Sequence, residues 1–354
     1  MANTGRDMPG AADAGLVDRF GRCATDLRVS LTDRCNLRCQ YCMPEEGLPL
    51  LPLTKILTDD EVIRLVRIGV ERLGISKVRF TGGEPLLRKG LERIVEATAQ
   101  LRSPDRPVDI SLTTNALGLS HRARALRDAG LDRVNISLDS ASRGEYFALS
   151  RRDRFDHVLE GIRAAVEVGF SPVKINAVVM PGVNDHSVGK LLSLALSLGA
   201  TLRFIEYMPI GPQGEWQRDE VLTSGAIIEA LSRDFELSPF PESVRGSSPA
   251  ALWHVAAGSF EGQEFPAGSV GFISSVSEPF CSQCDRTRLT AEGSIRSCLF
   301  SDEEHDLRAL LRGGYDDEAV ADAWRSAMRH KPESHGINRA DFVQPARNMS
   351  SIGG

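Results

Sequence analysis

The sequence predicts an α/β fold, an incomplete (β/α)6 barrel of the TIM type with a smaller C-terminal α+β domain covering its open side. Between about residues 26 and 210, six strand-like runs alternate with amphipathic helical segments. Such repeats form a parallel sheet that is either doubly wound or closed as a barrel. No glycine-rich dinucleotide fingerprint follows the first run, which favours a barrel with missing strands.

The six expected strands are short runs rich in β-branched and other apolar residues. They cover residues 26–32, 77–83, 109–115, 133–139, 172–180 and 201–208. A helix over residues 58–74 follows the first cysteine-containing loop, with Thr58 and Glu61 as a capping box and Gly74 as its C-terminal stop. Residues 120–130 form another amphipathic segment between strands.

Polar residues gather on one face of these strands. Side chains alternate between faces along a strand, so residues of one parity share a face. The polar sets are Arg28 and Ser30; Lys77 and Arg79; Ser111, Thr113 and Asn115; Asn135, Ser137 and Asp139; and Lys174 and Asn176. The sixth run breaks the rule, because Arg203 shares parity with Ile205.

This polar face is either solvated or the lining of a barrel lumen. Helices on the outside of a parallel sheet need the apolar face, so we interpret the polar face as a lumen that holds a ligand. Its cations are Arg28, Arg79, Lys174 and Arg203, with Lys77 as a fifth candidate. Gathered cations repel each other unless an anion lies among them, and phosphates are the expected anion.

The strand–helix alternation ends after about residue 210. A helical segment at 224–232 and a Gly/Ser/Pro-rich stretch at 240–250 precede strand-like runs at 251–256 and 269–277 and helices at 306–314 and 317–330. A chain of 354 residues exceeds the size of one hydrophobic core. We therefore expect a flexible tail at 1–15, the barrel at 16–240 and a C-terminal domain at 241–354.

Composition restricts the partners and the location. A net charge of −6 and a pI near 5.7 do not indicate binding to nucleic acid or to an anionic membrane, which an overall positive charge would favour. The first fifteen residues hold no apolar signal segment, and the most apolar stretch, 191–202, is too short to span a bilayer. We expect a cytoplasmic protein, in which seven cysteines indicate metal or redox chemistry more than disulfides.

Three of these cysteines directly follow the first strand. Cys35, Cys39 and Cys42 have the spacing Cys-x3-Cys-x2-Cys. Three close cysteines alone are also compatible with a zinc site that lacks a ligand or with buried core thiols. They can equally hold three irons of a [4Fe–4S] cluster, which leaves the fourth iron open to an outside ligand.

The position of this motif, with Tyr41 before its last cysteine, resembles the signature of the radical S-adenosylmethionine (SAM) superfamily. The segment TGGEP at 81–85, at the end of the second strand, resembles the superfamily's binding segment for the methionine amino group. The resemblance implies that SAM chelates the open iron and that the reduced cluster cleaves SAM to a 5′-deoxyadenosyl radical. The resemblance further implies that the protein orients this fragment and excludes competing reactions.

A second triad, Cys281, Cys284 and Cys298, lies near the end of the chain. Its spacing, Cys-x2-Cys-x13-Cys, fits zinc at least as well as iron. His305, seven residues after Cys298, could complete a Cys3His zinc site. Spacing alone therefore leaves both metals open.

The flanking segments narrow the resemblance. Residues 16–354 resemble the GTP 3′,8-cyclase (MoaA) family of molybdenum-cofactor biosynthesis. The segments that carry it are LRVSLTDRCNLRCQYCMP, KVRFTGGEPLLR, LTTNAL, VNISLDS, RFIEYMPIG, FCSQCDRTRLTAEGSIRSCLF and the terminal Gly-Gly. This resemblance implies a second [4Fe–4S] cluster on the second triad, with its open iron bound to the guanine of GTP.

The resemblance also assigns the other site residues. GTP contacts fall on Arg28, Arg79, Thr113, Lys174, Arg286 and Arg288, with Lys77 and Arg203 as further basic positions. SAM contacts fall on Tyr41, Gly83, Ser137 and Met208, with Glu84 and Asn176 as neighbours. A Gly-Gly tail is usually plain disorder, but the family resemblance implies that Gly353 and Gly354 enter the active site.

The implied reaction removes the C3′ hydrogen of GTP, joins C3′ to C8 of guanine and yields 3′,8-cyclo-7,8-dihydro-GTP. The implied partners are a flavodoxin- or ferredoxin-like electron donor and, downstream, cyclic pyranopterin monophosphate synthase; a homodimer is a further hypothesis. Two alternatives remain at this point. One is another radical SAM enzyme with an auxiliary cluster that acts on a peptide or small molecule, and the other is a zinc or iron–sulfur binding or electron-transfer module.

Overall fold

Six parallel strands form the centre of the protein in a computed structural model that describes residues 15–103, 106–214 and 216–352. Each strand is hydrogen-bonded to the next along the chain, apart from one short intervening ribbon. The six are β1 (Asp26–Ser30), β2 (Lys77–Thr81), β5 (Asp109–Thr114), β6 (Arg133–Ser137), β7 (Val173–Val179) and β8 (Thr201–Glu206). The predicted incomplete barrel is confirmed, whereas residues 1–14 of the expected tail lie outside the described residues.

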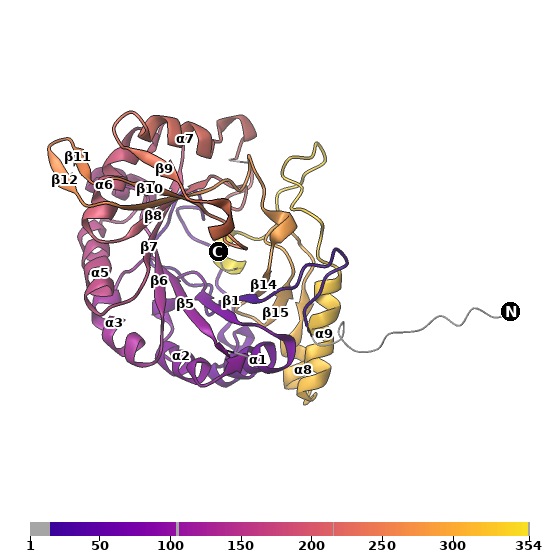
Figure 1. Ribbon diagram of the computed structural model, residues 1–354. Helices are drawn as coiled ribbons and strands as arrows, with labels where there is room; N and C mark the ends of the chain where they lie inside the picture. The colour runs from indigo at the N-terminus through magenta and orange to yellow at the C-terminus, as the bar shows by residue number, and fades with distance from the viewer. Residues whose placement is uncertain (1–14, 104–105, 215, 353–354) are drawn as a thin grey trace.

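Helices cover the outer face of this curved sheet, as Figure 1 shows. They are α1 (Asp59–Leu73), α2 (Leu91–Ala99), α3 (Leu119–Asp128), α4 (Arg143–Ser150), α5 (Phe155–Glu167) and α6 (Val188–Ser197). The predicted capping box of Thr58 and Glu61 is present, and Gly74 ends α1 in the left-handed conformation that glycine tolerates. The expected helix ends are therefore correct.

The predicted separation of the two strand faces is also confirmed. Leu27, Val29, Val78 and Phe80 are fully buried against the helices. The opposite parity in the same strands carries Arg28 and Arg79, which line an internal cavity. Burying the apolar set removes it from water and holds the helices on the sheet, so the cavity wall can be polar.

The C-terminal segment prolongs the sheet at both edges. At one edge β13 (Gly268–Ile273) pairs in parallel with β8, and β10 (Ala251–Val255) and β9 (Leu237–Pro239) follow in antiparallel orientation. At the other edge β14 (Arg286–Leu289) pairs in parallel with β1, followed by β15 (Ser294–Arg296) and β16 (His305–Asp306). A sheet of twelve strands results.

This arrangement refines the expected cover over the open side. The later residues lie across that side in Figure 1, but they do so as continuations of the barrel sheet. The strand over residues 286–289 was not predicted. The domain boundary expected at residues 240 and 241 stays a prediction.

The remaining elements lie around this sheet. They are the ribbons β3 (Arg102–Ser103) with β4 (Arg106–Pro107) and β11 (Gly258–Phe260) with β12 (Gln263–Phe265), and the helices α7 (Ser224–Leu231), α8 (Leu307–Arg312), α9 (Asp317–Arg329) and α10 (Met349–Ile352). Trp324 of α9 is fully buried and donates to the Thr287 hydroxyl of β14 over 3.0 Å. Gly69 of α1 makes room for this indole, because a Cβ there would lie 3.3 Å from the ring.

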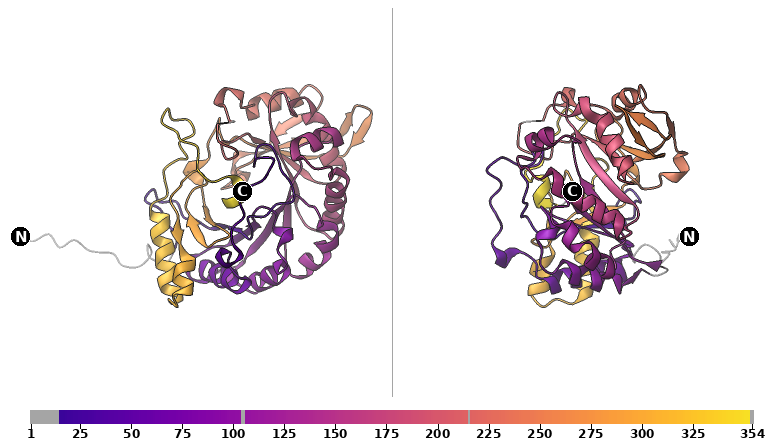
Figure 2. Two further views of the ribbon diagram at one scale, coloured as in Figure 1. Left: turned by 180° about the vertical axis from the view of Figure 1, so that it is seen from behind. Right: turned by 90° about the vertical axis from the view of Figure 1, so that its left-hand side faces the viewer.

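The short helix α10 lies within the ring of strands, as the left view of Figure 2 shows. In α10, Ser350 and Ile352 are buried, and the Met349 amide donates to the Ile210 carbonyl over 2.8 Å. The predicted entry of Gly353 and Gly354 concerns residues outside those described. Within the described chain, no helix combines the length and the apolar character that a membrane crossing requires.

Candidate active site

Two cavities occupy the lumen, and each contains one of the cysteine triads. The first, of about 180 Å³, is lined by Cys35, Cys39 and Cys42. The second, of about 170 Å³, is lined by Cys281, Cys284 and Cys298. Four residues line both cavities: Thr113, Asn176, Ile205 and Met349. The two triads therefore face adjoining parts of one lumen.

The first triad lies in the loop that follows β1. Its three cysteines are free, and backbone bonds from the Cys42 and Met43 amides to the Cys39 carbonyl fold the loop tightly. Burial, followed by the charge of the neighbouring Cys35, raises the pKa of Cys42 to about 12. Burial also raises the pKa of Cys39, followed by the charges of Asp139, Cys42 and Cys35.

These shifts describe three thiols held close together away from water. Burial and mutual repulsion of the thiolates raise these pKa values. A cationic iron core would offset both, because it compensates the thiolate charges and replaces water as their partner. The first triad thus fits three irons of a cluster.

The glycines of TGGEP allow the second strand's loop to touch the cysteine loop. A Cβ on Gly83 would lie 2.3 Å from the Arg34 carbonyl oxygen, and one on Gly82 would lie 2.6 Å from that of Thr32. The Gly83 amide donates to the Thr32 carbonyl over 2.7 Å. Glycine is therefore required here for a close backbone approach.

Glu84, the acid of the same segment, is fully buried in the first cavity's wall. Its carboxylate accepts hydrogen bonds from the Leu86 and Asn115 amides and from the Thr114 hydroxyl. Burial raises its pKa to about 7 despite these bonds. Glu84 joins the ends of β2 and β5 beside Cys35, and Asn115 also directs its amide nitrogen at the Cys35 sulfur over 3.9 Å.

Tyr41 and Asp139 connect the cysteine loop to β7. The Tyr41 hydroxyl donates to Asp139 over 2.9 Å, and the other Asp139 oxygen accepts from the Val178 amide over 2.9 Å. Burial raises the pKa of Asp139 to about 6. The predicted Tyr41, Gly83, Glu84, Ser137 and Asn176 all line the first cavity, together with Asp139 of the polar strand face.

Basic side chains donate hydrogen bonds to the backbone carbonyls around the second triad. Buried Lys331 donates to the carbonyls of Cys284 and Arg286 over 3.0 and 2.8 Å. Arg22 donates to the Cys281 carbonyl over 2.7 Å. Burial raises the pKa of Cys284, but Lys331 and Arg286 outweigh it and the pKa falls below its usual value. This electropositive frame favours the thiolate of Cys284, the metal-binding form, whereas burial raises the pKa of Cys281 and of Cys298.

Neither Lys331 nor Arg22 was predicted, because their partners are backbone groups far away in the sequence. The alternative role of His305 as a fourth ligand of the second triad finds no support. His305 lies beside Glu303 and His330, outside the residues that line this cavity.

Five arginines line the second cavity: Arg28, Arg79, Arg203, Arg286 and Arg288. Among the described lining residues there is no carboxylate. Burial lowers the pKa of Arg28 well below its usual value, and the charges of Arg79, Arg288 and Arg286 lower it further. The Asp26 carboxylate, outside the lining residues, is 3.9 Å from Arg79. The Nε atoms of Arg28, Arg79 and Arg286 are buried without a hydrogen-bond partner, which fits an anionic ligand.

Arg203 organises the wall between the cavities. Its guanidinium donates to the side-chain oxygens of Asn176 over 2.9 Å and Asn135 over 2.7 Å. Burial lowers its pKa to about 9. Because the Asn176 oxygen is engaged by Arg203, Asn176 offers its N–H groups to a ligand. In β8 the apolar Ile205 lies on the same strand face as Arg203, unlike the polar pairs of the other strands. The structure explains this exception, because Ile205 also faces the lumen and lines both cavities.

Three predicted residues lie apart from their expected partners. Lys77 is 3.4 Å from Asp285 and 3.3 Å from the Ser247 hydroxyl, and it lines neither cavity. Lys174 is also absent from the described lining residues of both cavities; burial lowers its pKa to about 7, and the Arg203 charge contributes. Met208 lines the second cavity, so its SAM contact stays a prediction.

Comparison with known proteins identifies two families. Residues 29–195 match the Radical SAM superfamily, and residues 200–337 match the Molybdenum Cofactor Synthesis C family. GTP 3′,8-cyclase of Mycobacterium marinum is 57% identical over 348 residues, which cover 98% of this chain and 94% of that protein. GTP 3′,8-cyclase of Corynebacterium glutamicum is 54% identical, covering 98% of this chain and 91% of that one.

Solved structures share the fold at low sequence identity. Streptococcus suis SuiB is 14% identical with a TM-score of 0.59, covering 94% of this chain and 78% of that one. The SuiB structure bound to S-adenosylmethionine has a TM-score of 0.58, also at 14% identity, and covers 94% of this chain and 77% of that one. Superfamily membership implies SAM and iron–sulfur clusters as cofactors, and the two triads with their supporting residues fit that implication. The chain therefore belongs to the radical SAM superfamily and, within it, to the GTP 3′,8-cyclase family.

Proposed function

We propose that this chain converts GTP to 3′,8-cyclo-7,8-dihydro-GTP, the first step of molybdenum-cofactor biosynthesis. The observation that carries the proposal is the pair of triad-bearing cavities that share Thr113 and Asn176, with an arginine cluster on the side of the second triad. Two ligands, one anchored in each cavity, would contact each other at the wall that the cavities share.

The first cavity is the proposed SAM site. Cys35, Cys39 and Cys42 would hold the first cluster. Tyr41, Gly83, Glu84, Ser137 and Asn176 surround the adjoining space, and Met208 approaches from the second cavity. When bound, the reduced cluster and SAM supply the one-electron chemistry that removes the C3′ hydrogen of GTP. The polar groups of this cavity orient SAM, and the buried walls keep water from competing with the substrate.

The second cavity is the proposed GTP site. Cys281, Cys284 and Cys298 would hold the second cluster, whose open iron takes the guanine. Arg28, Arg79, Arg286 and Arg288 offer charge-assisted hydrogen bonds to the triphosphate, and Lys174 and Arg203 add positive charge nearby. We keep Lys77 as a further basic group of this region. Anchoring the base and the phosphates at opposite ends fixes the ribose at Thr113 and Asn176, which solves the positioning problem of joining C3′ to C8.

The proposed protein partners and cellular location follow from the same chemistry. A one-electron reaction needs an electron donor, for which we propose a flavodoxin- or ferredoxin-like protein. We propose that the product passes to cyclic pyranopterin monophosphate synthase, that the protein forms a homodimer, and that it works in the cytoplasm, where thiols stay reduced.

The test is an anaerobic incubation of the protein, reconstituted with iron and sulfide, with SAM, reductant and GTP. We expect both 5′-deoxyadenosine and a cyclised nucleotide, and neither when Cys35 is replaced by alanine. SAM cleavage without any nucleotide product would favour a radical SAM enzyme with another substrate. No SAM cleavage in a protein with full iron content would contradict the proposal.

A further inference from the structure

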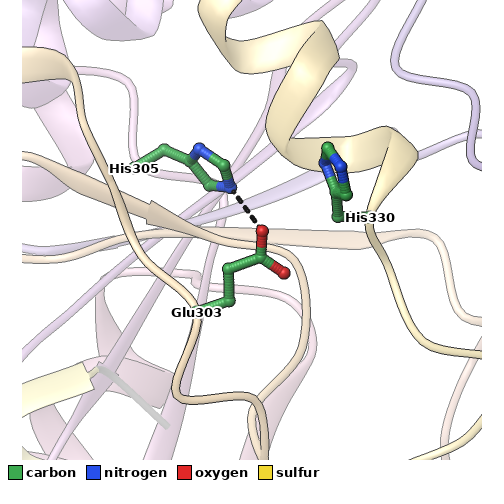
Figure 3. Close-up of side chains that lie close together, drawn as sticks. All are labelled: Glu303, His305 and His330. Atoms are coloured by element: carbon green, nitrogen blue, oxygen red, sulfur yellow. Dashed lines mark hydrogen bonds and ion pairs between the residues drawn. The ribbon is translucent and has the colours of Figure 1, made fainter.

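Two histidines and a glutamate meet on the surface, outside the two cavities. Figure 3 shows Glu303, His305 and His330 as neighbours, with a contact drawn between His305 and Glu303, and the two imidazole rings stack with their centroids 6.1 Å apart. Their nitrogen and oxygen ligand atoms all lie within 4.8 Å of each other. His305 belongs to β16, His330 caps the C-terminal end of α9, and Glu303 precedes β16. The cluster therefore joins two elements that are separate in the sheet and helix layers.

The hydrogen bonds of His330 leave one ring nitrogen available. Its Nδ1 lies 2.9 Å from the Ser326 carbonyl oxygen. A carbonyl only accepts, so Nδ1 carries the proton and Nε2 has a free lone pair. A histidine that donates its other ring N–H to a backbone carbonyl is the usual arrangement of a metal-binding imidazole.

The spacing of the other two groups also fits a metal. His305 Nε2 is 3.2 Å from Glu303 Oε1. Two ligands at about 2.0–2.1 Å from a tetrahedral zinc ion are roughly 3.3 Å apart. The three side chains are exposed or partly exposed, and their ligand atoms already lie within 4.8 Å of one another, so small side-chain adjustments bring them to one ion.

The surrounding charges favour a cation. Residues 302–306 include four carboxylates. Glu304 pairs with Arg296 and Arg347, and Asp306 pairs with Arg308. Within the described chain, Glu303 pairs with no arginine or lysine. The C-terminal end of α9, at which His330 lies, also carries the negative end of the helix dipole.

We propose that Glu303, His305 and His330 bind a divalent transition-metal ion of the zinc class, with water as the fourth ligand. Two imidazoles, one carboxylate and one water form a coordination set that zinc accepts. The ion ties the end of α9 to β16. Lys331, which follows His330, donates to the Cys284 and Arg286 carbonyls, so the ion stabilises the frame of the second triad from outside.

The test uses the protein reconstituted with both clusters. After anaerobic equilibrium dialysis against a low-micromolar Zn²⁺ solution, zinc and iron are counted in the same sample. We expect about one zinc per chain with unchanged iron. His305→Ala and His330→Ala should each weaken zinc binding by about 100-fold or more, because each removes a direct ligand. His121→Ala, at an exposed histidine of α3, is the matched control and should retain the zinc.

A second measurement guards against misfolded variants. Zn²⁺ should raise the midpoint of thermal unfolding of the parent and of His121→Ala, and it should leave His305→Ala and His330→Ala unchanged. Zinc uptake accompanied by a matching loss of iron would place the ion at the cysteines and overturn the proposal. Equal zinc retention in all three variants, or no retention in the parent, would also overturn it.

Discussion

Arg28 of β1 lies directly beside Arg288 of β14, as its register partner in a parallel strand pair. The two residues come from opposite ends of the sequence, yet both line the second cavity. Their neighbours Asp26 and Arg286 are also register partners. The pairing therefore gathers arginines from two distant segments around one space, where an anionic ligand would relieve their mutual repulsion.

Replacing Arg79 or Arg286 by alanine should weaken GTP binding. Each substitution removes a charge-assisted hydrogen bond of about 1.5–3 kcal/mol, which corresponds to about 10- to 150-fold in affinity. SAM binding should persist, because the proposed SAM site is the other cavity. Isothermal titration calorimetry of both ligands measures this, with Arg143→Ala at an exposed surface position as the control. An unchanged GTP affinity in both variants would remove these arginines from the site.

GTP binding should take up a proton through Lys174. Burial, followed by the charges of Arg203, Arg133 and Arg79, lowers the pKa of Lys174 to about 7 in the free protein, so at about pH 8 the amine is mostly neutral. A nearby triphosphate raises this pKa and protonates the amine. GTP affinity should then fall as the pH rises from about 7 toward 10.

Calorimetry in two buffers of different ionisation enthalpy measures this uptake. Lys174→Met should abolish it, whereas Lys190→Met, in α6, should keep it. Binding heats that do not depend on the buffer in the parent protein would place Lys174 too far from the phosphates to matter.

Gly83→Ala should remove the first cluster. The added Cβ would lie 2.3 Å from the Arg34 carbonyl oxygen, so the loop that carries Cys35 must shift. With two [4Fe–4S] clusters, about half of roughly eight irons should be lost. Gly144→Ala is the matched control, because a Cβ there meets only the Ser142 hydroxyl at 3.9 Å. Full iron content in Gly83→Ala would show that the loop tolerates the displacement.

Deleting Gly353 and Gly354 should abolish cyclisation without loss of either cluster. In the preceding helix α10, Ser350 and Ile352 are buried, and the Ser350 amide bonds to the Cys42 sulfur, so the chain enters the lumen just before these glycines. Only residues without side chains fit a crowded polar pocket and still offer backbone donors. Iron content and nucleotide product are measured together; parental turnover in the truncated protein would show that the tail takes no part.

Much of the barrel and its polar wall was predictable because strands have a period of two. The alternation of side chains along a strand was enough to predict that Arg28, Arg79 and Asn176 lie on the inner face, where the structure has them. The same rule placed Lys77 inside, but a flexible side chain at the start of a strand can turn to a carboxylate nearby, here Asp285. Parity determines the face of a strand and not the partner of a long side chain.

The second triad's surroundings could not be predicted in this way. β14 has four residues and pairs with β1, which precedes it by most of the chain. Local patterns do not encode such a long-range pairing. Lys331 and Arg22 hold backbone carbonyls, which are present at every position and leave no signature in the sequence. The family resemblance named the cysteines and arginines, whereas their supports became visible only in the structure.

The central claim is that SAM in the first cavity and GTP in the second meet at the shared wall. Incubation of the reconstituted protein with SAM, reductant and GTP deuterated at C3′ tests it most directly. The predicted result, measured by mass spectrometry, is 5′-deoxyadenosine that carries one deuterium, formed together with cyclised nucleotide that has lost it. Unlabelled 5′-deoxyadenosine alongside cyclised product that retains the deuterium would contradict the account.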